Sequence, residues 1–427
     1  MVGLKVTPRG LWEMTAPPAP SLAALAQTVQ ADVAIVGAGV TGLSAALELA
    51  RHGANVVVVE AADVGSGAIG RSSGLVNAGM WISPEQVRSI LGRDHGDRLL
   101  HALGEAPRDL FALIDRHGIA CDHERAGTLQ CAVGASGLKA MEARARSWAE
   151  IGADVELLDA EQTQVRVGSA CYRGALLDRR TGTVQPLAYV RGLASAAVAA
   201  GALIFVNSPA IGFEPVSNRW RVRTTAGEVI ADRVLIATDT YAMSDDFDLR
   251  SEFVNLPYFN IATRPLTQGE LTSVLPSRQA ITDTRKVLSS YRLDRDGRLI
   301  IGSVGALSGA GRSTHVAWAN RAINRLFPHL GQVSLDFGWY GAIGMTDIHL
   351  PAIHEPAPGI LSAGGYNGRG IAAGTLFGRS IAEYFLGRRH ARELPVPISL
   401  VRRARHKYVR GIFYEWGARV VHVADRF

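Results

Sequence analysis

Cysteine, lysine and long apolar runs are all scarce in this sequence. Its 427 residues include three cysteines, Cys121, Cys131 and Cys171, without a CxxC pair, which excludes a disulfide framework and a cysteine-based metal cluster. No histidine spacing is typical of zinc either, so we expect no bound metal. No apolar run reaches the ~18 residues of a membrane span, and the first thirty residues lack a secretory pattern. These absences predict a cytoplasmic protein with free thiols.

Positive charge is in slight excess and comes almost wholly from arginine. The formal net charge is +6, and the basic residues are scattered apart from RRARHKYVR at 402–410. An anionic substrate or cofactor explains such a mild excess as well as a nucleic acid does. We therefore expect no nucleic-acid partner, and a flavin-bearing RNA-modification or RNA-binding protein stays as the alternative of another class.

The stretch ADVAIVGAGVTGLSAALELARHGANVVVVE, residues 31–60, has the pattern of a strand, a glycine turn, a helix and a second apolar strand. Such a unit implies a parallel sheet covered on both faces. Gly37 permits the tight turn, Gly39 lets the backbone approach a pyrophosphate, and Gly42 lets the helix lie close to the strand. Glu60 ends the second strand, where its carboxylate can take both hydroxyls of an adenosine ribose. The stretch predicts a dinucleotide site at a helix N-terminus.

Two further glycine stretches favour FAD over NAD. The first is GSGAIGRSSGLVNAGMW at 65–81, and the second is SAGGYNGRGIAAG at 362–374, which again opens a helix. An NAD site needs no such distant loop. An isoalloxazine ring deep in the protein does need backbone donors at its pyrimidine oxygen, and a late helix N-terminus can supply them.

The order of elements predicts an α/β protein with a Rossmann-like FAD-binding domain and an inserted substrate domain of mixed antiparallel β-sheet plus helices. A helix is expected from about Ser83 to Gly118, and hairpins are expected to turn at Ala226–Gly227 and Asp296–Gly297. The predicted boundaries are 31–100, 172–250 and 335–390 for the FAD-binding domain, 101–171 and 251–334 for the substrate domain, 1–30 for an N-terminal arm and 391–427 for a C-terminal helical tail.

Four stretches resemble the D-amino-acid-oxidase (DAO) superfamily of flavoproteins, whose members oxidise C–N bonds of amines and amino acids. They are GLSAALELARHGANVVVVEAADVGSGAIGRSSGLVNAG, GALLDRRTGTVQPLAYVRGLA, YRLDRDGRLIIGS and YNGRGIAAGTLFGRSIAEY. They are similar to bacterial γ-glutamylputrescine oxidoreductases and look closer still to bacterial L-pipecolate oxidases. The resemblance implies oxidation of a cyclic amino acid such as L-pipecolate to its imine, with γ-glutamylputrescine or another N-substituted amine as the alternative.

The resemblance also implies the cofactor contacts, residue by residue. Those expected from the first loop and strand are Gly37, Gly39, Val40, Thr41, Gly42 and Glu60; those from the second loop are Arg71, Ser72, Ser73, Gly74 and Leu75; those from the late loop are Gly365, Asn367, Gly368, Arg369, Gly370 and Ile371; and Ala210, Ala237 and Thr238 complete the set. Covalent attachment in relatives uses a Cys or His in particular loops. All three cysteines here precede residue 172, so we expect non-covalent FAD.

Two departures from the family pattern bear on this site. Ile69 replaces a serine in the second loop, where Ser72 and Ser73 also replace Asn-Gly. Asp239 stands in VLIATDTYA where the family commonly has Gly or Asn, and it places a carboxylate near the cofactor.

Amine oxidation needs an apolar surface facing the ring, a cation for any substrate carboxylate and surroundings that disfavour ammonium. The catalytic candidates are Trp81, Arg292, Tyr340 and His349. Arg292 is expected to hold the carboxylate, although it can instead pair with Asp294 or Asp296 across its hairpin. Trp81 and His349 have structural alternatives as core residues.

The chain's partners are expected to be a small-molecule amine or amino acid and, as electron acceptor, oxygen or the respiratory chain. Lys286 is a candidate for activating oxygen, but a solvated edge residue is the favoured interpretation. In the tail, Ala404, Tyr408, Ile412, Trp416 and Val420 recur on a four-residue spacing beside the basic run. This stripe is expected to pack on the protein, with peripheral contact to the inner membrane as the alternative.

Overall fold

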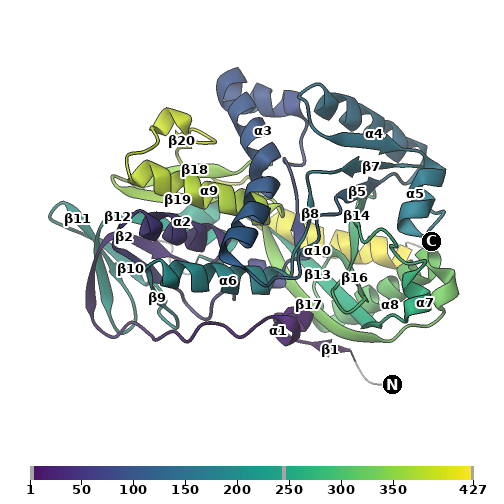
Figure 1. Cartoon of the computed structure of the whole chain (residues 1–427), viewed down its shortest axis with the longest axis horizontal. Coiled ribbons are helices and arrows are strands. Elements are labelled where there is room, and N and C mark those ends of the chain that lie inside the picture. Colours follow the sequence, from purple (N-terminus) through teal and green to yellow (C-terminus); the bar gives the residue numbers. More distant parts are fainter. Residues whose placement is uncertain (1–3, 243–246, 425–427) are drawn as a thin grey trace.

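The computed structural model describes residues 4–242 and 247–424. The predicted segments 1–30, 172–250 and 391–427 therefore lie partly outside the described residues. Two large sheets lie side by side, one on each half of the view in Figure 1. The long helix α3 (Pro84–His117) runs across the region where they meet.

The first sheet has nine strands in the described chain and contains the predicted dinucleotide unit. Its order along the main path is β20 (Ile398–Ser399), β18 (Ala352–Ala357), β19 (Ile360–Gly364), β12 (Glu228–Ile236), β2 (Thr28–Val36), β3 (Val56–Val59) and β9 (Leu203–Phe205), and the hairpin of β10 (Gly212–Val216) and β11 (Arg219–Arg223) joins it at β12. From β19 to β9 all neighbouring strands are parallel. The predicted turn at Ala226–Gly227 is confirmed, since β11 pairs antiparallel with β12.

One face of this sheet is covered by helices, and the other is covered by a hairpin, loops and a short 3-10 turn. The covering helices are α2 (Val40–Arg51), α6 (Pro186–Ala199), α9 (Gly370–Phe385) and α3. A Cβ at Gly378 would lie 2.2 Å from the carbonyl oxygen of Thr41, so α2 and α9 touch backbone to backbone. The opposite face buries Val57 and Val59 among residues of strands, loops and a short 3-10 turn, including Val222 of β11. The predicted parallel sheet covered on both faces is thus confirmed, and the β10–β11 hairpin contributes to the second cover.

The second sheet also has nine strands within the described residues and is mostly antiparallel. Its order is β1 (Lys5–Val6), β17 (Leu335–Met345), β13 (Val254–Pro265), β16 (Arg298–Val304), β15 (Ser289–Leu293), β14 (Ala280–Asp283), β5 (Thr128–Cys131), β7 (Ala175–Asp178) and β6 (Val155–Leu158). The predicted hairpin at Asp296–Gly297 is confirmed as β15 and β16. The core of this half packs Phe259 and Ile301 against Trp318 of α8 (Gly309–Leu326).

The remaining elements are short or lie at the periphery. They are α1 (Gly10–Thr15), α4 (Gly134–Ala149), α5 (Ala160–Val167), α7 (Gln268–Leu271), α10 (Lys407–Ala424), the 3-10 turns η1 (Ile69–Arg71), η2 (Asp239–Tyr241), η3 (Leu249–Glu252), η4 (Pro328–Leu330) and η5 (Ala391–Glu393), and the small sheet of β4 (Leu75–Val76) and β8 (Gly182–Thr183). Within the described chain, none of the helices combines the length and the apolar character that a bilayer crossing demands.

The predicted helix at 83–118 is confirmed, and its ends follow from local chemistry. The Ser83 hydroxyl accepts from the Gln86 N–H while the Gln86 side chain accepts from the Ser83 N–H, and Pro84 occupies the first turn. Gly118 ends the helix in the left-handed conformation with φ 58°. Gly92, with φ 76°, interrupts the helix near its start.

The sheet topology corrects the predicted domain boundaries. The range 172–250 was assigned to the FAD-binding domain, but β7 pairs with β5 and β6 of the second sheet. The range 335–390 was assigned in the same way, but β17 pairs with β13 along nearly its whole length. An apolar strand pattern does not specify which sheet the strand joins, because partner choice depends on distant segments.

Both ends of the chain are also more ordered than an arm and a tail. The arm contains α1, β1 and the start of β2, and β1 pairs with β17. In the tail, β20 pairs with β18, and α10 packs on β13 and α8. The stripe that was expected to pack on the protein is exposed instead, since Tyr408 is 78% exposed and Trp416 is 61% exposed. The side of α10 that packs on the protein carries Ala418 and His422, which are buried.

Candidate functional site

A cavity of about 580 Å³ lies where the two sheets meet. The first sheet contributes Val36 and Ile236 from its strand ends, and the second contributes Tyr258, Ser290 and Ile343 from β13, β15 and β17. The volume is typical of small-molecule sites, which measure roughly 300–1,000 Å³. The carboxyl ends of parallel strands are where such folds place their ligands.

The N-terminus of α2 opens into this cavity. Gly37 has φ 106°, and a Cβ there would lie 3.0 Å from the Ala237 carbonyl oxygen, so the turn requires glycine. A Cβ at Gly39 would meet no protein atom within 4 Å, which leaves the approach to the helix N–H groups open. A Cβ at Gly42 would lie 2.0 Å from the Gly37 carbonyl oxygen. The three glycines therefore stand where a pyrophosphate site needs them.

Glu60 lines the cavity beside this helix. Its Oε2 accepts from the Ala38 N–H at 2.8 Å and its Oε1 accepts from the Ala62 N–H at 3.1 Å. Burial raises the pKa of Glu60, and the backbone hydrogen bonds oppose that shift in part. The carboxylate is thus fixed in place, with acceptor capacity left over for two hydroxyl groups.

We expect Glu60→Gln to weaken FAD binding by about 1–3 kcal/mol, because the amide loses charge-assisted acceptance and turns one donor toward a backbone N–H. In the unchanged protein, FAD affinity should fall on acidification, and the fall should begin at a higher pH than for an ordinary glutamate, because burial raises the pKa of Glu60. Titration of apoprotein with FAD measures both effects. Equal affinity of the two proteins at every pH would show that Glu60 does not hold the ribose.

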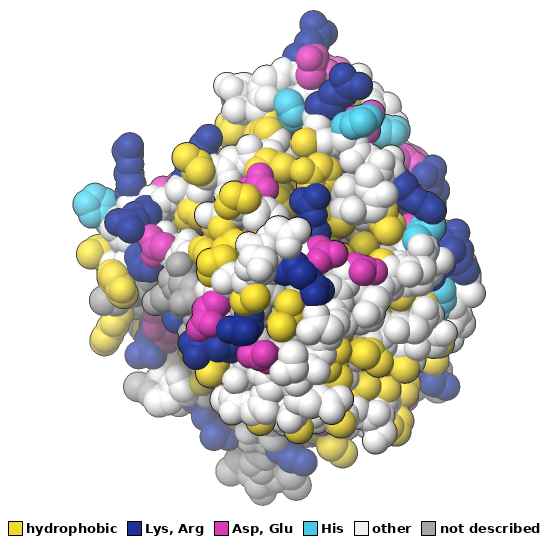
Figure 2. Space-filling model, turned by 90° about the vertical axis from the view of Figure 1, so that its left-hand side faces the viewer, with side chains coloured by type: hydrophobic (Ala, Val, Ile, Leu, Met, Phe, Trp, Pro, Cys, Tyr) yellow, Lys and Arg dark blue, Asp and Glu magenta, His cyan; other side chains and the backbone are white. Residues whose placement is uncertain are grey.

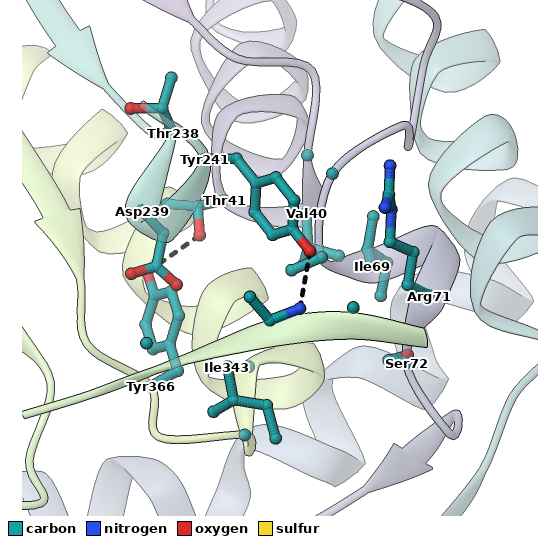
Figure 3. Close-up of a pocket in the computed structure, with 18 of the residues that line it drawn as sticks. Val40, Thr41, Ile69, Arg71, Ser72, Thr238, Asp239, Tyr241, Ile343 and Tyr366 are labelled. Carbon is teal, nitrogen blue, oxygen red and sulfur yellow. Dashed lines mark hydrogen bonds between the residues drawn. The ribbon is translucent and has the colours of Figure 1, made fainter. Parts of the chain in front are cut away.

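The second loop follows β3 and reaches the cavity through Arg71, Ser72 and Ser73. The Arg71 Nε donates to the Ser66 carbonyl oxygen at 3.2 Å, and its guanidinium lies 5.5 Å from the ring centre of Tyr241. Figure 3 shows Arg71 and Tyr241 on the same side of β17, with the Tyr241 hydroxyl accepting from the Ala342 N–H. The Ser72 Oγ is buried without a partner in the described chain, so a ligand can supply one.

The late loop closes the cavity from the start of α9. Asn367 has φ 51°, its Oδ1 accepts from the Thr346 N–H at 2.8 Å, and its carbonyl oxygen accepts from Trp81 Nε1 at 2.7 Å. The Tyr366 hydroxyl is hydrogen-bonded to Thr41 at 2.9 Å, which links the late loop to α2 (Figure 3). Residues more than 280 positions apart are thus held together at one wall.

Asp239 lies at the end of β12, inside the cavity. Its φ is 46°, and its Oδ1 accepts from the Gly365 N–H at 3.1 Å. Burial raises the pKa of Asp239 to about 6. Asp239 therefore positions the late loop through one hydrogen bond and keeps a titratable carboxyl at the cavity wall (Figure 3).

The cavity gathers most of the predicted cofactor residues. Those that line it are Gly37, Gly39, Val40, Thr41, Glu60, Arg71, Ser72, Ser73, Gly74, Leu75, Ala210, Ala237, Thr238, Asn367, Gly368, Gly370 and Ile371. Gly42 lies in the first turn of α2 against the Gly37 carbonyl oxygen, and the Gly365 N–H donates to Asp239. The Arg369 side chain points to a separate recess. The contacts of these residues with FAD remain predictions.

The second sheet forms the distal end of the cavity, lined by Leu256, Tyr258, Thr282, Leu288, Ser290 and Val304. The Tyr258 hydroxyl lies 2.8 Å from the Ser290 hydroxyl, and burial raises the pKa of Tyr258. Trp81 and His349 also line the cavity, as the sequence predicted for a pocket wall. Tyr258 and Ser290 were missed, because both lie in strands whose faces the sequence does not assign.

Arg292 does not reach the cavity, which corrects its predicted role as a carboxylate clamp. Its Nη1 donates to the carbonyl oxygens of Val184, Gly74 and Ser73 at 2.7, 3.1 and 3.2 Å, and its guanidinium lies over Trp12 at 5.5 Å. Burial lowers the pKa of Arg292 to about 10. The side chain braces the loop before β4. The predicted pairing with Asp294 or Asp296 belongs instead to Arg298.

Tyr340 is also misplaced in the prediction. The neighbouring Gly341 faces Arg71 and Tyr241, and side chains alternate along β17, so Tyr340 packs against the core of the second sheet. Lys286 is exposed on the loop between β14 and β15 and does not line the cavity. Tyr340 was predicted from a strand pattern that leaves the facing direction open, whereas the favoured interpretation of Lys286 as a solvated edge residue agrees with its exposure.

The residues present fit FAD. The open Gly39 position, the helix N–H groups, the fixed Glu60 carboxylate and the unpartnered Ser72 hydroxyl are chemically matched to a pyrophosphate and a ribose. None of the three cysteines lines the cavity, and burial raises the pKa of Cys121 to about 12. Among the described residues, no cluster of three or more His, Cys, Asp or Glu side chains is arranged to hold a metal.

Comparisons with known proteins agree with this site. Residues 32–384 match the family model DAO, described as FAD dependent oxidoreductase. The chain is 33% identical over 369 residues to the probable oxidoreductase OrdL of Haemophilus influenzae, covering 85% of this chain and 84% of that protein. It is 31% identical over 367 residues to the gamma-glutamylputrescine oxidoreductase of Escherichia coli, covering 85% of each.

A solved structure shows the same fold. Glycine oxidase from Geobacillus kaustophilus superposes with a TM-score of 0.71 at 21% identity, over 88% of this chain and 99% of that one. The residues matched by the family model include the glycine turn before α2, the glycine stretches at 65–81 and 362–374, and nearly all of α9. The chain therefore belongs to the DAO family of FAD-dependent oxidoreductases, which act on C–N bonds of amines and amino acids.

Proposed function

We propose that this enzyme oxidises the C–N bond of an N-substituted amine of the γ-glutamylputrescine kind, rather than L-pipecolate. The observation that carries the proposal is the lining of the distal end, where the described residues are apolar or hydroxyl-bearing and include no Lys or Arg. A carboxylate on the reacting carbon needs a cation beside it. The nearest lining cation, Arg71, is engaged by the Ser66 carbonyl and the Tyr241 ring. The similarity to a gamma-glutamylputrescine oxidoreductase supports the same choice.

The residues of the distal end prepare the amine for oxidation. When bound, FAD would supply the acceptor for the hydride equivalent that leaves the carbon beside nitrogen. The Tyr258–Ser290 hydroxyl pair can orient the nitrogen, and the apolar wall disfavours the ammonium form. Burial lowers the pKa of His349, so its neutral imidazole adds no positive charge to the cavity wall.

Anaerobic mixing of the holoenzyme with matched amines tests the proposal. We expect γ-glutamylputrescine to bleach the flavin, and piperidine to do so at least as well as L-pipecolate. The reduction rate should rise with pH through the bound amine's pKa, because only the free base surrenders hydride. Reduction by L-pipecolate at a rate far above that of piperidine would restore the amino-acid assignment. No bleaching by any amine of the panel would refute the proposed reaction.

We also propose that α10 touches an anionic membrane surface, which would give the enzyme access to a respiratory acceptor. The outward face of this helix carries Tyr408, Phe413, Trp416 and Val420, each more than 60% exposed. The exposed Arg402 and Arg405 precede it, and cations beside an apolar helical face suit anionic lipid headgroups. A basic groove for RNA has no such support: on the face in Figure 2, Lys and Arg lie dispersed among Asp and Glu.

Co-sedimentation with vesicles tests the membrane contact. We expect binding to phosphatidylglycerol vesicles, weak binding to phosphatidylcholine vesicles, and loss of binding in the Phe413→Ser/Trp416→Ser double variant with unchanged flavin content. The double variant is conservative for the fold because both side chains are exposed. Equal sedimentation of both proteins would contradict the proposal. A dimer that dissociates in the double variant would show that a second copy covers α10.

A further inference from the structure

A small polar recess adjoins the cavity and has no assigned role. Its volume is about 40 Å³, and it shares Leu75, Asn77 and Thr282 with the lining of the main cavity. A single water needs roughly 10–15 Å³ measured this way, so the recess is large enough for a group of a few heavy atoms. It lies between α4 and the strands β5, β7 and β14.

Three arginines gather at this recess around one carboxylate. The Arg180 guanidinium binds Asp178 through two hydrogen bonds of 2.9 and 2.7 Å, which neutralises that acid. Arg144 and Arg369, which both line the recess, have no carboxylate partner in the described chain. Their neighbourhood therefore carries a net positive charge.

The two unpaired arginines are held in place by aromatic rings and backbone carbonyls. The Arg369 guanidinium lies 4.1 Å from the ring centre of Trp81, and its Nη1 has only long hydrogen bonds of 3.3 and 3.4 Å. The Arg369 Nε is buried without a partner, and so is the Trp148 Nε1. Arg144 lies over Trp148 and donates to the Met80 and Trp81 carbonyl oxygens at 2.9 Å. Unused donors thus remain at the recess.

This arrangement is costly without an anion. Burial lowers the pKa of Arg369 to about 9 and that of Arg144 to about 10, and the charge of Arg144 adds to the shift of Arg369. A buried cation is destabilising unless an opposite charge and hydrogen bonds compensate it. A planar guanidinium is matched in shape to a carboxylate, which it can bind through two parallel hydrogen bonds.

A polar row on the second sheet connects the distal end to the recess. Ser290, Thr282 and Gln130 are cross-strand partners on β15, β14 and β5, so their side chains share one face. Ser290 lines the main cavity, Gln130 lines the recess, and Thr282 lines both. Two strand spacings separate the ends of this row, which is about 10 Å. An extended molecule can follow it, whereas a small ring cannot.

We infer that Arg369 and Arg144 bind the carboxylate of a substrate whose reacting amine lies about 10 Å away at the Tyr258–Ser290 end of the cavity. This inference rests on the proposed function and narrows it to amines that carry a remote carboxylate. An amino acid with its carboxylate on the reacting carbon, such as L-pipecolate, is too short to reach both ends.

Two matched pairs of probes test the assignment: γ-glutamylputrescine with its decarboxylated counterpart N-(4-aminobutanoyl)putrescine, and L-pipecolate with piperidine. Kd is taken from the concentration dependence of anaerobic flavin reduction, and ligand-induced Tm shifts give a second readout that needs no turnover. In the unchanged enzyme, γ-glutamylputrescine should bind at least tenfold more tightly than its decarboxylated counterpart, a difference of about 1.4 kcal/mol. The Kd values of L-pipecolate and piperidine should differ little.

Arg369→Met should abolish the tenfold preference within the first pair, and Arg369→Lys should retain part of it, because lysine keeps the charge but lacks the fork. Arg191→Met is the matched control, since Arg191 is also buried but binds Glu13 and the Pro17 carbonyl oxygen and does not line the recess. This variant should keep the tenfold preference for γ-glutamylputrescine over its decarboxylated counterpart. Flavin content and Tm report folding.

A Kd ratio near one for the first pair in the unchanged enzyme overturns the inference even if Arg369→Met does not fold. A tenfold Kd ratio that survives in Arg369→Met also overturns it and would show that the arginines only hold the backbone in place. A tenfold preference for L-pipecolate over piperidine in the unchanged enzyme that disappears in Arg369→Met would place the carboxylate on the reacting carbon. Absence of flavin reduction by every probe refutes the proposed function, while the Tm shifts still decide whether the recess binds a carboxylate.

Discussion

Gly39→Val should yield a folded protein that purifies without its yellow colour. The Cβ at this position meets no protein atom within 4 Å, and the backbone at φ −88° and ψ −173° is extended, which valine accepts readily. The branched side chain would occupy the space in front of the α2 N–H groups where the pyrophosphate approaches. We expect FAD affinity to fall at least a hundredfold, equivalent to about 2.7 kcal/mol. Absorbance of the purified protein and FAD titration of apoprotein measure it.

Two glycine controls separate loss of cofactor from loss of fold. Gly269→Val in α7 also adds a side chain to open space, but away from the cavity, and should keep full flavin. Gly42→Ala places a Cβ 2.0 Å from the Gly37 carbonyl oxygen, so it should lower Tm as well as flavin content. A Gly39→Val protein with a normal flavin spectrum would show that the pyrophosphate does not lie at this turn.

Arg292→Met is expected to destabilise the whole enzyme by about 2–4 kcal/mol, because the carbonyl oxygens of Ser73 and Gly74 in the loop before β4 and of Val184 after β8 lose the guanidinium donor that they share. The Trp12 ring also loses the cation above it. FAD affinity should fall too, since Ser73 and Gly74 of that loop line the cavity. Thermal unfolding and FAD titration report these losses, and the reduction kinetics of L-pipecolate and piperidine should change alike.

Arg298→Met is the comparison for this variant, as it removes an arginine of the same hairpin that pairs with the buried Asp294 and the exposed Asp296. It should also lower Tm, because the buried Asp294 carboxylate loses its cation. It should keep FAD affinity, since neither ion pair involves the loop before β4. If Arg292→Met kept the Tm of the unchanged enzyme and weakened only L-pipecolate, Arg292 would act on the substrate after all, and the sequence-based role would stand.

Local patterns in the sequence were sufficient for the nucleotide site. The strand, the glycine turn, the helix and the acid of residues 31–60 are consecutive, so each constrains the next through backbone geometry alone. The β11–β12 and β15–β16 hairpins are local in the same sense, and their turn residues mark them. The ends of α3 follow from its capping residues.

The substrate half depended on contacts that no local pattern specifies. Every residue of β15 is buried, so the alternation that assigns a strand face is missing, and Arg292 was predicted to face the wrong partner. Its true partners, Ser73, Gly74 and Val184, lie 108 to 219 positions away. The packing face of α10 was misjudged for a related reason, since its apolar residues are split between two sides and only β13 and α8 decide which side is covered.

Sequence alone therefore determined the family, the cofactor and the glycine turn before α2, because each is marked by short consecutive stretches of residues. Only the tertiary structure decided which sheet β7 and β17 join, that Trp81 meets Asn367 from 286 positions away, and that Arg144 and Arg369 converge on one recess. These contacts between residues distant in sequence depend on strand order and on which side chains of a fully buried strand face the cavity. Both are set by the free energy of the whole packed core rather than by any one segment.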